Sequence, residues 1–168
     1  MMDSNGSTVS VREMRVEDAE AVSILTVELG YARTPDDIRT WLVESGLNQS
    51  GPNRCSPAQS SPNQAAFVAC LNGEVVGWIE AAVERRVQSD PYVLIGGLVV
   101  GQRARGAKIG RQLCERVETW SWEQGVATVR VTSRSTRPHA HRFYLQNGYE
   151  TVKTSIVFEK KCPQRKRP

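Results

Sequence analysis

Residues 94–125 combine an apolar run, a turn rich in glycine and arginine, and a stretch with helical hydrophobic periodicity. This order is typical of a strand, a loop and a helix. The N-terminus of a helix carries free N–H groups and a partial positive charge, so such a turn suits an anion. Arg105 and Lys108 add full charges, while Gly106 and Gly110 allow a ligand to approach the backbone closely. These residues predict a phosphate site, with a pyrophosphate as the expected ligand.

Two common phosphate-binding motifs do not fit this turn. A Walker-type loop needs a lysine followed by serine or threonine, whereas Lys108 is followed by Ile109. A dinucleotide fingerprint needs three glycines at set spacing and a later acidic residue, and the glycines here are spaced differently. For this stretch taken alone, a plain strand-to-helix turn stays open as the alternative.

A second informative region covers residues 133–149. Pro138 suits the first turn of a short helix, and Asn147-Gly148 suits its end. Spacings of three and four residues then bring three side chains near one face of this helix: Ala140, Phe143 and Tyr144.

Together and in this order, the two regions resemble the GNAT family of N-acetyltransferases. The acetyl-CoA loop of that family reads Gln/Arg-x-x-Gly-x-Gly/Ala; Arg105 and Gly110 match its outer positions, and Lys108 stands where the middle glycine is usual. The late segment of the family reads Asn-x-x-Ala-x-x-Phe-Tyr-x-x-x-Gly-Tyr/Phe, and Arg137 stands in place of its asparagine. The residues that match the late segment are Ala140, Phe143, Tyr144, Gly148 and Tyr149.

The resemblance implies a site for acetyl-CoA, which would serve as the acetyl donor. A strand end would orient the pantetheine through backbone hydrogen bonds, the loop would hold the pyrophosphate, and the late helix would flank the cofactor. The residues assigned to these three parts are Leu98, Val99 and Val100; Arg105, Gly106, Ala107, Lys108, Ile109, Gly110 and Arg111; and Arg137, Ala140, Phe143 and Tyr144.

Acetyl-CoA is an activated thioester, so an amine that is held close and neutral can attack it directly within a ternary complex. Tyr144 is our candidate proton donor to the departing thiolate, because a phenol with a pKa of about 10 suits a thiolate of similar basicity. Glu80 is the candidate base, directly or through water, and Glu84 is an alternative. The acceptor would be a small amine or a protein amino group. An acyl-CoA-binding sensor of the same fold, without turnover, is the alternative function.

Composition fits one globular domain. The chain has 168 residues, of which 39% are hydrophobic and 24% charged, and no apolar run is long enough to span a membrane. The first ten residues lack the layout of a signal peptide, and the four cysteines show no metal-ligand spacing. We therefore expect a cytoplasmic protein with reduced thiols, no metal and no membrane partner.

The positive formal net charge of the chain comes from its last nine residues. Residues 160–168 hold five basic side chains and no acidic one, so the formal net charge of +4 becomes +4 − 5 = −1 for the remainder. Such a tail could bind nucleic acid, but a solvated tail is the more frequent case. We do not expect nucleic acid to be the main partner.

The elements that position these residues follow from periodicity and turn signals. The pattern predicts a strand at Val9–Met14, a helix from Asp18 to the stop at Gly30, and a second helix that begins at Thr34-Pro35. Residues 45–64 are rich in Gly, Pro, Ser and Asn and predict a long loop.

The remaining segments predict a sheet. Ala65–Leu71 and Val75–Val83 are expected to form a hairpin around Asn72-Gly73, and Asp90-Pro91 is expected to interrupt the chain before a strand at Tyr92–Val100. Val126–Thr132 is predicted to run parallel to that strand, and Thr151–Glu159 to form the last strand.

The resulting fold class is α/β (α+β), with a mixed, mainly antiparallel central sheet flanked by helices. The resemblance adds a V-shaped acetyl-CoA cleft. The domain organisation is a flexible N-terminus at residues 1–8, a single acetyltransferase domain at 9–159 that includes the long loop, and a basic tail at 160–168. Sheet edges in this fold commonly pair into dimers, so a homodimer stays open.

Overall fold

The computed structural model describes residues 8–47 and 63–161. Contacts within the chain divide it into two compact units, residues 1–132 and residues 133–168, which are described separately. Residues 1–7 of the predicted flexible N-terminus, most of the predicted long loop and residues 162–168 of the predicted basic tail lie outside the described residues. No helix in the described part is long and apolar enough to cross a membrane.

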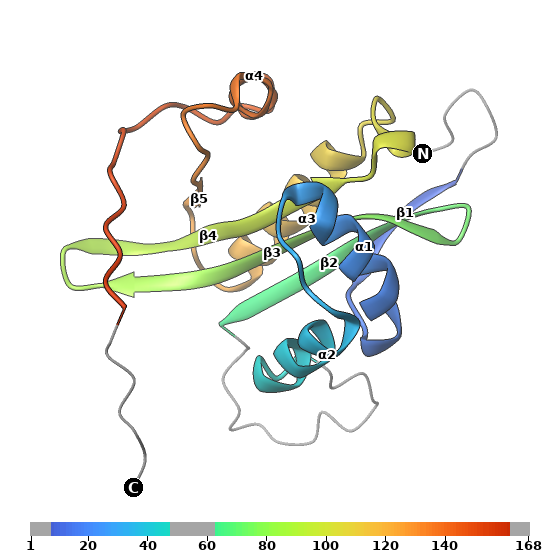
Figure 1. The fold of residues 1–168 in the computed structure, drawn as a ribbon. Helices are drawn as coiled ribbons and strands as arrows, with labels where there is room; N and C mark the ends of the chain where they lie inside the picture. Colours follow the sequence, from blue (N-terminus) through green and yellow to red (C-terminus); the bar gives the residue numbers. More distant parts are fainter. Residues whose placement is uncertain (1–7, 48–62, 162–168) are drawn as a thin grey trace, which may run out of the picture. The chain divides into compact units, whose positions relative to one another are not determined.

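The first unit is built on a five-stranded sheet in the order β1-β2-β3-β4-β5. β1 to β4 pair antiparallel, and β5 pairs parallel to β4 (Figure 1). The predicted mixed, mainly antiparallel sheet is therefore confirmed. The strands are β1 (Val9–Glu13), β2 (Gln64–Leu71), β3 (Glu74–Arg86), β4 (Ser89–Val100) and β5 (Val129–Val131).

Both faces of the sheet are covered by helices. α1 (Ala19–Leu29) and α2 (Pro35–Glu44) lie on one face, and α3 (Ile109–Glu123) lies on the other (Figure 1). Alternation along β2 explains how one strand serves both faces, since successive side chains of a strand point to opposite sides. Ala66 and Val68 belong to the core shared with α1 and α2, whereas Phe67 packs beneath the guanidinium of Arg116 from α3. A strand covered on both faces reads as a nearly continuous apolar run.

The ends of the first two helices confirm their predicted start and stop signals. α1 ends at Gly30, whose φ of 102° lies in the left-handed region that favours glycine. α2 begins with a capping box, in which the Thr34 hydroxyl accepts from the Asp37 N–H and the Asp37 carboxylate accepts from the Thr34 N–H. These ends fix the segment between the two helices, which contributes to the site described below.

The predicted interruption at Asp90-Pro91 is wrong, because both residues lie inside β4. Arg86 pairs with Ser89 and Glu84 pairs with Tyr92, so β4 carries one more residue than β3 between these pairs. Such a bulge leaves a residue without a ladder partner, and there a proline, which has no N–H, is tolerated. The hairpin therefore extends further than the proline signal suggested.

β4 and β5 are in contact over only part of their length. The parallel pairs are Val93 with Val129, Leu94 with Arg130 and Ile95 with Val131. From Gly96 to Val100 the pairs recorded for β4 are with β3 alone. The strand predicted at 126–132 is thus parallel as expected but shorter, and within the described part of the first unit β5 does not pair with the carboxyl end of β4.

The second unit contains α4 (Pro138–Gln146), whose start at Pro138 and end before Asn147-Gly148 agree with the prediction. The rings of Phe143 and Tyr144 meet edge to face at a centroid distance of 5.2 Å, and those of Tyr144 and Tyr149 at 5.6 Å.

The strand predicted at Thr151–Glu159 is absent from the structure. Residues 151–161 have no regular secondary structure and are exposed, and Val157 and Phe158 are each 89% exposed. Alternating apolar residues form a strand only where a neighbouring strand supplies hydrogen-bond partners, and no pairing is recorded for this described segment.

Candidate functional site

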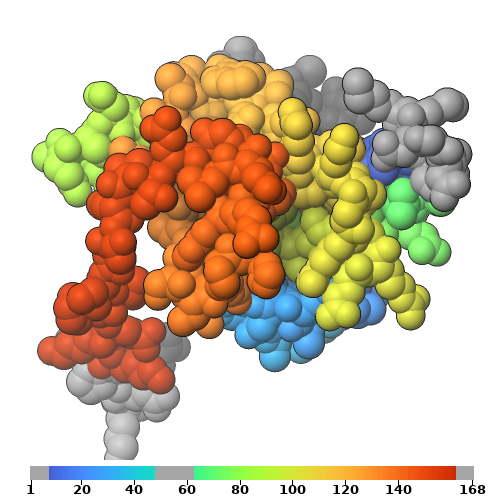
Figure 2. Space-filling model, turned by 90° about the horizontal axis from the view of Figure 1, so that it is seen from above, coloured from blue at the N-terminus to red at the C-terminus, as the bar shows by residue number. Residues whose placement is uncertain are grey.

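The loop that follows β4 has the backbone expected of an anion-binding turn. A short 3-10 helix (η2, Gln102–Ala104) leads to Gly106 with φ 90° and to Lys108 with φ 55°, both left-handed. Lysine rarely adopts this conformation, whereas glycine does so without strain. Lys108, at the position where the motif usually has its middle glycine, thus adopts a backbone conformation that favours glycine and adds a charged side chain there. Figure 2 shows this segment, in yellow, on the surface.

The N-terminus of α3 directly follows the loop. Lys108 is its N-cap, and no side chain caps the first turn. The first N–H groups of a helix have no partner within the helix, and a helix of 15 residues adds a partial positive charge there. The side chains of Arg105, Lys108 and Arg111 add cations around this turn, and all three are exposed. The arrangement can bind a phosphate group through N–H groups and charges together.

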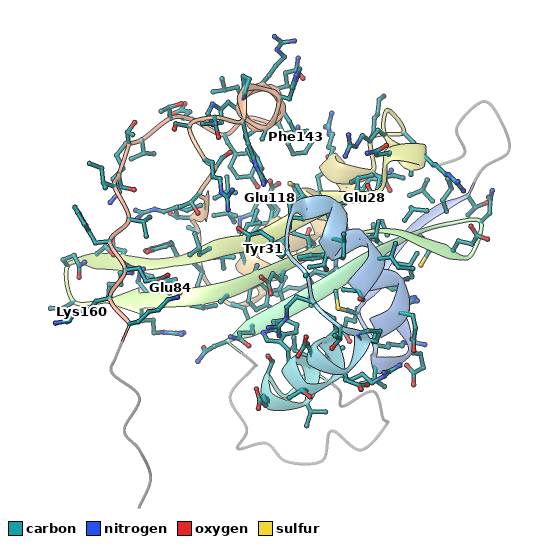
Figure 3. The ribbon with its side chains drawn as sticks, in the orientation of Figure 1. Glu28, Tyr31, Glu84, Glu118, Phe143 and Lys160 are labelled. Atoms are coloured by element: carbon teal, nitrogen blue, oxygen red, sulfur yellow. The ribbon has the colours of Figure 1, made fainter. Side chains whose placement is uncertain are left out.

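Two contacts fix the loop to the rest of the first unit. Arg105 Nε donates to the carbonyl oxygen of Val100 at 3.4 Å, and the Gln102 N–H donates to Glu28 Oε2 at 3.2 Å. Glu28, labelled in Figure 3, comes from the last turn of α1. The start of the loop is thereby held by the strand it leaves and by the helix on one face of the sheet.

A cavity of about 300 Å³ lies on the face of the sheet that carries α1 and α2. The described residues of its walls are mostly apolar or aromatic, with one carboxylate and one guanidinium among them. The lining residues are Met14, Val22, Thr26, Leu29, Tyr31, Arg33, Ile38, Trp41, Trp78, Glu80, Gly96 and Gly97.

Glu80 is the carboxylate of this cavity. Burial raises the pKa of Glu80 above its usual value, and the positive charge of Arg33 opposes part of that rise. No hydrogen bond or ion pair to Glu80 is recorded within the described residues. A half-buried carboxyl with a raised pKa in a cavity is a candidate for proton transfer near neutral pH.

The backbone of β4 makes room for this carboxylate. Glu80 pairs with Gly97 and Ala81 pairs with Ile95, so Gly96 is an extra residue that forms a bulge. A Cβ atom at Gly96 would lie 3.0 Å from Glu80 Oε1, and one at Gly97 would lie 2.7 Å from the Trp78 ring. Two glycines in succession therefore let Glu80 and Trp78 lie directly against the strand.

Arg33 supplies the positive charge of the cavity. It lies between α1 and α2, immediately before the capping residue Thr34. Its charge acts on two carboxylates. It opposes the rise in the pKa of Glu80, and it adds to the lowering of the pKa of Asp37 that the hydrogen bonds with Thr34 chiefly cause. Asp37 is already bound to the N–H of Thr34, and no ion pair of the Arg33 side chain is recorded within the described part of the chain.

The structure brings together part of the predicted site. Glu80 and the strand end Leu98–Val100 share the paired strands β3 and β4, and the loop residues 105–111 follow directly. Glu84, the alternative base, pairs instead with Arg86 at 3.3 Å and lies near the turn end of β3 (Figure 3). It is absent from the cavity lining.

The predicted residues of the second unit lie on or next to α4. Arg137 is its N-cap, and Ala140, Phe143 and Tyr144 lie in its interior, each partly buried. Their assignment to the cofactor stays a prediction.

Three features of the cavity were not predicted from the sequence: Arg33, the Gly96-Gly97 pair and the Trp78 ring. The glycine pair carried a usable signal, because glycine inside a strand often marks a bulge or a close approach. Arg33 carried none, since a single arginine before a helix start is common. No cluster of potential metal ligands occurs among the residues that the structure describes.

Comparison with known proteins gives consistent results. A family model described as Acetyltransferase (GNAT) family matches residues 32–149. An aminoalkylphosphonate N-acetyltransferase from Salmonella typhimurium is 36% identical over 84 residues, which cover 49% of this chain and 54% of that protein. An aminoglycoside N(6')-acetyltransferase type 1 from Stenotrophomonas maltophilia is 27% identical over 99 residues, 56% of this chain and 65% of that protein. The matches thus span less than two thirds of either relative.

Solved structures share the fold at low sequence identity. The aminoglycoside N-acetyltransferase AAC(6')-Iy in complex with CoA superposes with a TM-score of 0.76 at 19% identity, covering 96% of this chain and 100% of that one. An aminoglycoside acetyltransferase from an uncultured soil metagenomic sample, in complex with sisomicin, gives a TM-score of 0.68 at 18% identity, covering 92% and 97%.

Proposed function

The chain belongs to the acetyltransferase (GNAT) family, and we propose that it transfers the acetyl group of acetyl-CoA directly to an amine while both substrates are bound. The relatives named above act, by their names, on aminoalkylphosphonates and aminoglycosides. The acceptor of this chain is accordingly an amine.

The donor side of the proposal rests on the loop and on α3. The uncapped N-terminus of α3 and the cations of Arg105 and Lys108 suit the pyrophosphate of acetyl-CoA. The backbone of Leu98–Val100, where β5 does not pair with β4, would form hydrogen bonds with the pantetheine amides. The pantetheine would then lie along β4 as an added strand does. Arg137, Ala140 and Phe143 are proposed to flank the cofactor on the strength of the family pattern.

The acceptor side rests on the cavity, and its carboxylate is the observation that carries the proposal. Glu80 is half-buried, has a raised pKa, and lies against the bulge of β4 directly before the strand end assigned to the donor. An acyl-CoA sensor would have no need for a partly desolvated carboxylate there, because burying a charge is unfavourable without a compensating role.

The reaction has three parts. The acceptor enters as an ammonium ion and gives one proton to Glu80, directly or through water. The neutral nitrogen then attacks the thioester carbonyl, so that a C–N bond forms and the C–S bond breaks. The CoA thiolate takes a proton from Tyr144, the proposed donor, and the second proton that the nitrogen loses as the amide forms restores the Tyr144 phenol through solvent. The proton held by Glu80 is released to solvent, so that one proton leaves for each acetyl group transferred.

The first experiment is a calorimetric titration of acetyl-CoA into the wild type and into Arg105→Ala. A lost charge-assisted contact is worth about 1.5–3 kcal/mol, so we expect the Kd to rise roughly 10- to 100-fold. Arg85→Ala is the matched control, because Arg85 is an exposed arginine on β3 that contacts Asn63 and lies outside the loop and the cavity.

Turnover separates the two candidate functions. Release of free thiol from acetyl-CoA, measured with a panel of amines, supports the enzyme if it depends on the amine and is strongly reduced in Glu80→Gln. Tight binding of acetyl-CoA without thiol release for any amine would instead support the sensor. Failure of the wild type to bind acetyl-CoA would contradict both.

A further inference from the structure

We propose that the acceptor is a short amine that also carries an acidic group, and that Arg33 binds this group while Glu80 receives the amine. This inference rests on the proposed function and assigns the substrate class of the same site. It makes Arg33 the residue that determines acceptor specificity.

The first observation is that the cavity lining has charged groups of both signs. Among the described residues that line it, two carry charged side chains, Glu80 and Arg33, one of each sign. A site for a polycation such as an aminoglycoside needs several carboxylates, and a like charge at its wall disfavours such a ligand. A cavity with one carboxylate and one guanidinium complements a molecule with one ammonium and one acid group.

The second observation is that no ion pair is recorded for the Arg33 guanidinium among the described residues. Its charge is felt by Glu80 and Asp37, but Asp37 is engaged by the Thr34 N–H, and no ion pair fixes the guanidinium within the described residues. By contrast, Arg39 on the same helix pair is bound to both Glu20 and Asp36. A guanidinium left available at a cavity wall suits bidentate binding of a phosphonate or carboxylate.

The third observation is that the cavity is small and its walls are largely apolar and aromatic. Its volume of about 300 Å³ is at the low end for small-molecule sites. Trp41, Trp78 and Tyr31 provide apolar and aromatic surface in the same cavity. A short carbon chain that links an amine to an acid would contact these walls.

The test uses the full chain, acetyl-CoA and four acceptors of the form X–CH2–CH2–NH2. X is phosphonate (2-aminoethylphosphonate), carboxylate (β-alanine), hydroxyl (ethanolamine) or a second amine (ethylenediamine); neamine is added as an aminoglycoside. We expect kcat/KM for at least one acid to exceed that for ethanolamine by about tenfold or more, with the diamine and neamine lowest. The two acids separate phosphonate from carboxylate recognition, and a preference for either supports the proposal.

Variants then test the role of Arg33. Arg33→Gln should lower kcat/KM for the preferred acid about tenfold or more, mainly through KM, and lower that for ethanolamine much less. Because loss of the Arg33 charge also raises the pKa of Glu80, wild type and variant are compared on the high-pH plateau of their pH–rate profiles. Arg33→Lys should restore part of the loss because the charge remains without the planar fork. Arg85→Gln is the control that removes an exposed arginine outside the cavity. Acetyl-CoA affinity and the melting temperature of Arg33→Gln should match the wild type.

Two results would overturn the inference while the proposed function stands. One is a wild-type preference for ethylenediamine or neamine, and the other is an equal loss for all acceptors in Arg33→Gln. If acetyl-CoA binds but no amine of any class releases thiol, the proposed function fails and this inference fails with it.

Discussion

Glu80 is the residue at which the proposed chemistry opposes the stability of the fold. Burial raises the pKa of Glu80, with Arg33 opposing. The folded state therefore holds the Glu80 proton more tightly than the unfolded chain does. A group of this kind contributes stability below its unfolded pKa, and that contribution is lost as pH rises through the folded pKa.

We therefore expect Glu80→Gln to melt at a higher temperature than the wild type at pH 8 and at nearly the same temperature at pH 4. The same substitution removes the proposed base, which is worth about 10²- to 10⁴-fold in rate. In the wild type, kcat/KM should rise with pH as Glu80 loses its proton. The kcat/KM of Glu80→Gln should not show this rise.

Thermal melts across this pH range and a pH–rate profile check both parts. A variant that is less stable at pH 8, with full activity, would show that Glu80 is a structural carboxylate. Glu84→Gln is the matched control on the same strand, because Glu84 lies outside the cavity and pairs with Arg86.

At the scale of elements, the bulge in β4 has two neighbouring glycines with different surroundings. A Cβ at Gly97 would lie 2.7–2.8 Å from the buried Trp78 ring, whereas one at Gly96 would lie 3.0 Å from the end of the Glu80 side chain. A packed indole cannot move without disturbing the core, but a carboxylate can rotate away. The two alanine variants should therefore separate stability from activity.

We expect Gly97→Ala to lose about 1–3 kcal/mol of unfolding free energy, because overpacking forces the ring and backbone to shift. Gly96→Ala should stay close to wild-type stability but lose amine-dependent thiol release, since the Glu80 carboxylate is displaced. Denaturant unfolding and steady-state kinetics of both variants provide the measurement. Equal stability of the two variants would contradict the packing account.

Lys108, the N-cap of α3, has an unfavourable backbone conformation. Its φ of 55° is left-handed, which is unfavourable for most side chains and least so for glycine and asparagine.

We expect Lys108→Gly to raise the unfolding free energy by about 0.5–1 kcal/mol and Lys108→Val to lower it, because a β-branched residue is least tolerant of this conformation. Lys108→Asn should fall between the two. Chemical denaturation of the three variants measures the order. The glycine variant should also bind acetyl-CoA more weakly, since a cation is lost beside the pyrophosphate.

At the scale of the whole molecule, the charge of the chain is unevenly distributed. Residues 160–168 account for more than the entire formal charge of +4 and leave −1 without them. We expect a chain truncated after residue 159 to lose its retention on a cation exchanger and to keep its acetyl-CoA turnover.

Binding to a short DNA duplex at two salt concentrations, with and without the tail, tests whether these residues meet a polyanion. A truncated chain that fails to turn over acetyl-CoA would assign the tail to catalysis and contradict this expectation. The cytoplasmic location and the homodimer also stay predictions, which fractionation and light scattering can measure.

Local signals in the sequence determined most of the first unit. Capping residues, the Asn72-Gly73 turn and strand alternation predicted α1, α2, the β2–β3 hairpin and the loop before α3, because each depends on neighbours within a few residues. The predicted strand at 151–159 was wrong for the complementary reason. Its alternation is local, but strand formation requires a partner that the local pattern does not supply.

The acetyl-CoA loop and Glu80 could likewise be read from the sequence, since residue types and spacing alone suggest a phosphate turn and a carboxylate on a strand. Tertiary structure decided which of two carboxylates, Glu80 or Glu84, lies in the cavity, and it brought Arg33 to the same cavity from a point 47 residues earlier in the chain. The sequence does not reveal that Arg33 and Glu80 share a cavity, because Glu80 becomes buried and Arg33 comes near it only when the helices pack on the sheet. The substrate class that we propose depends on that packing.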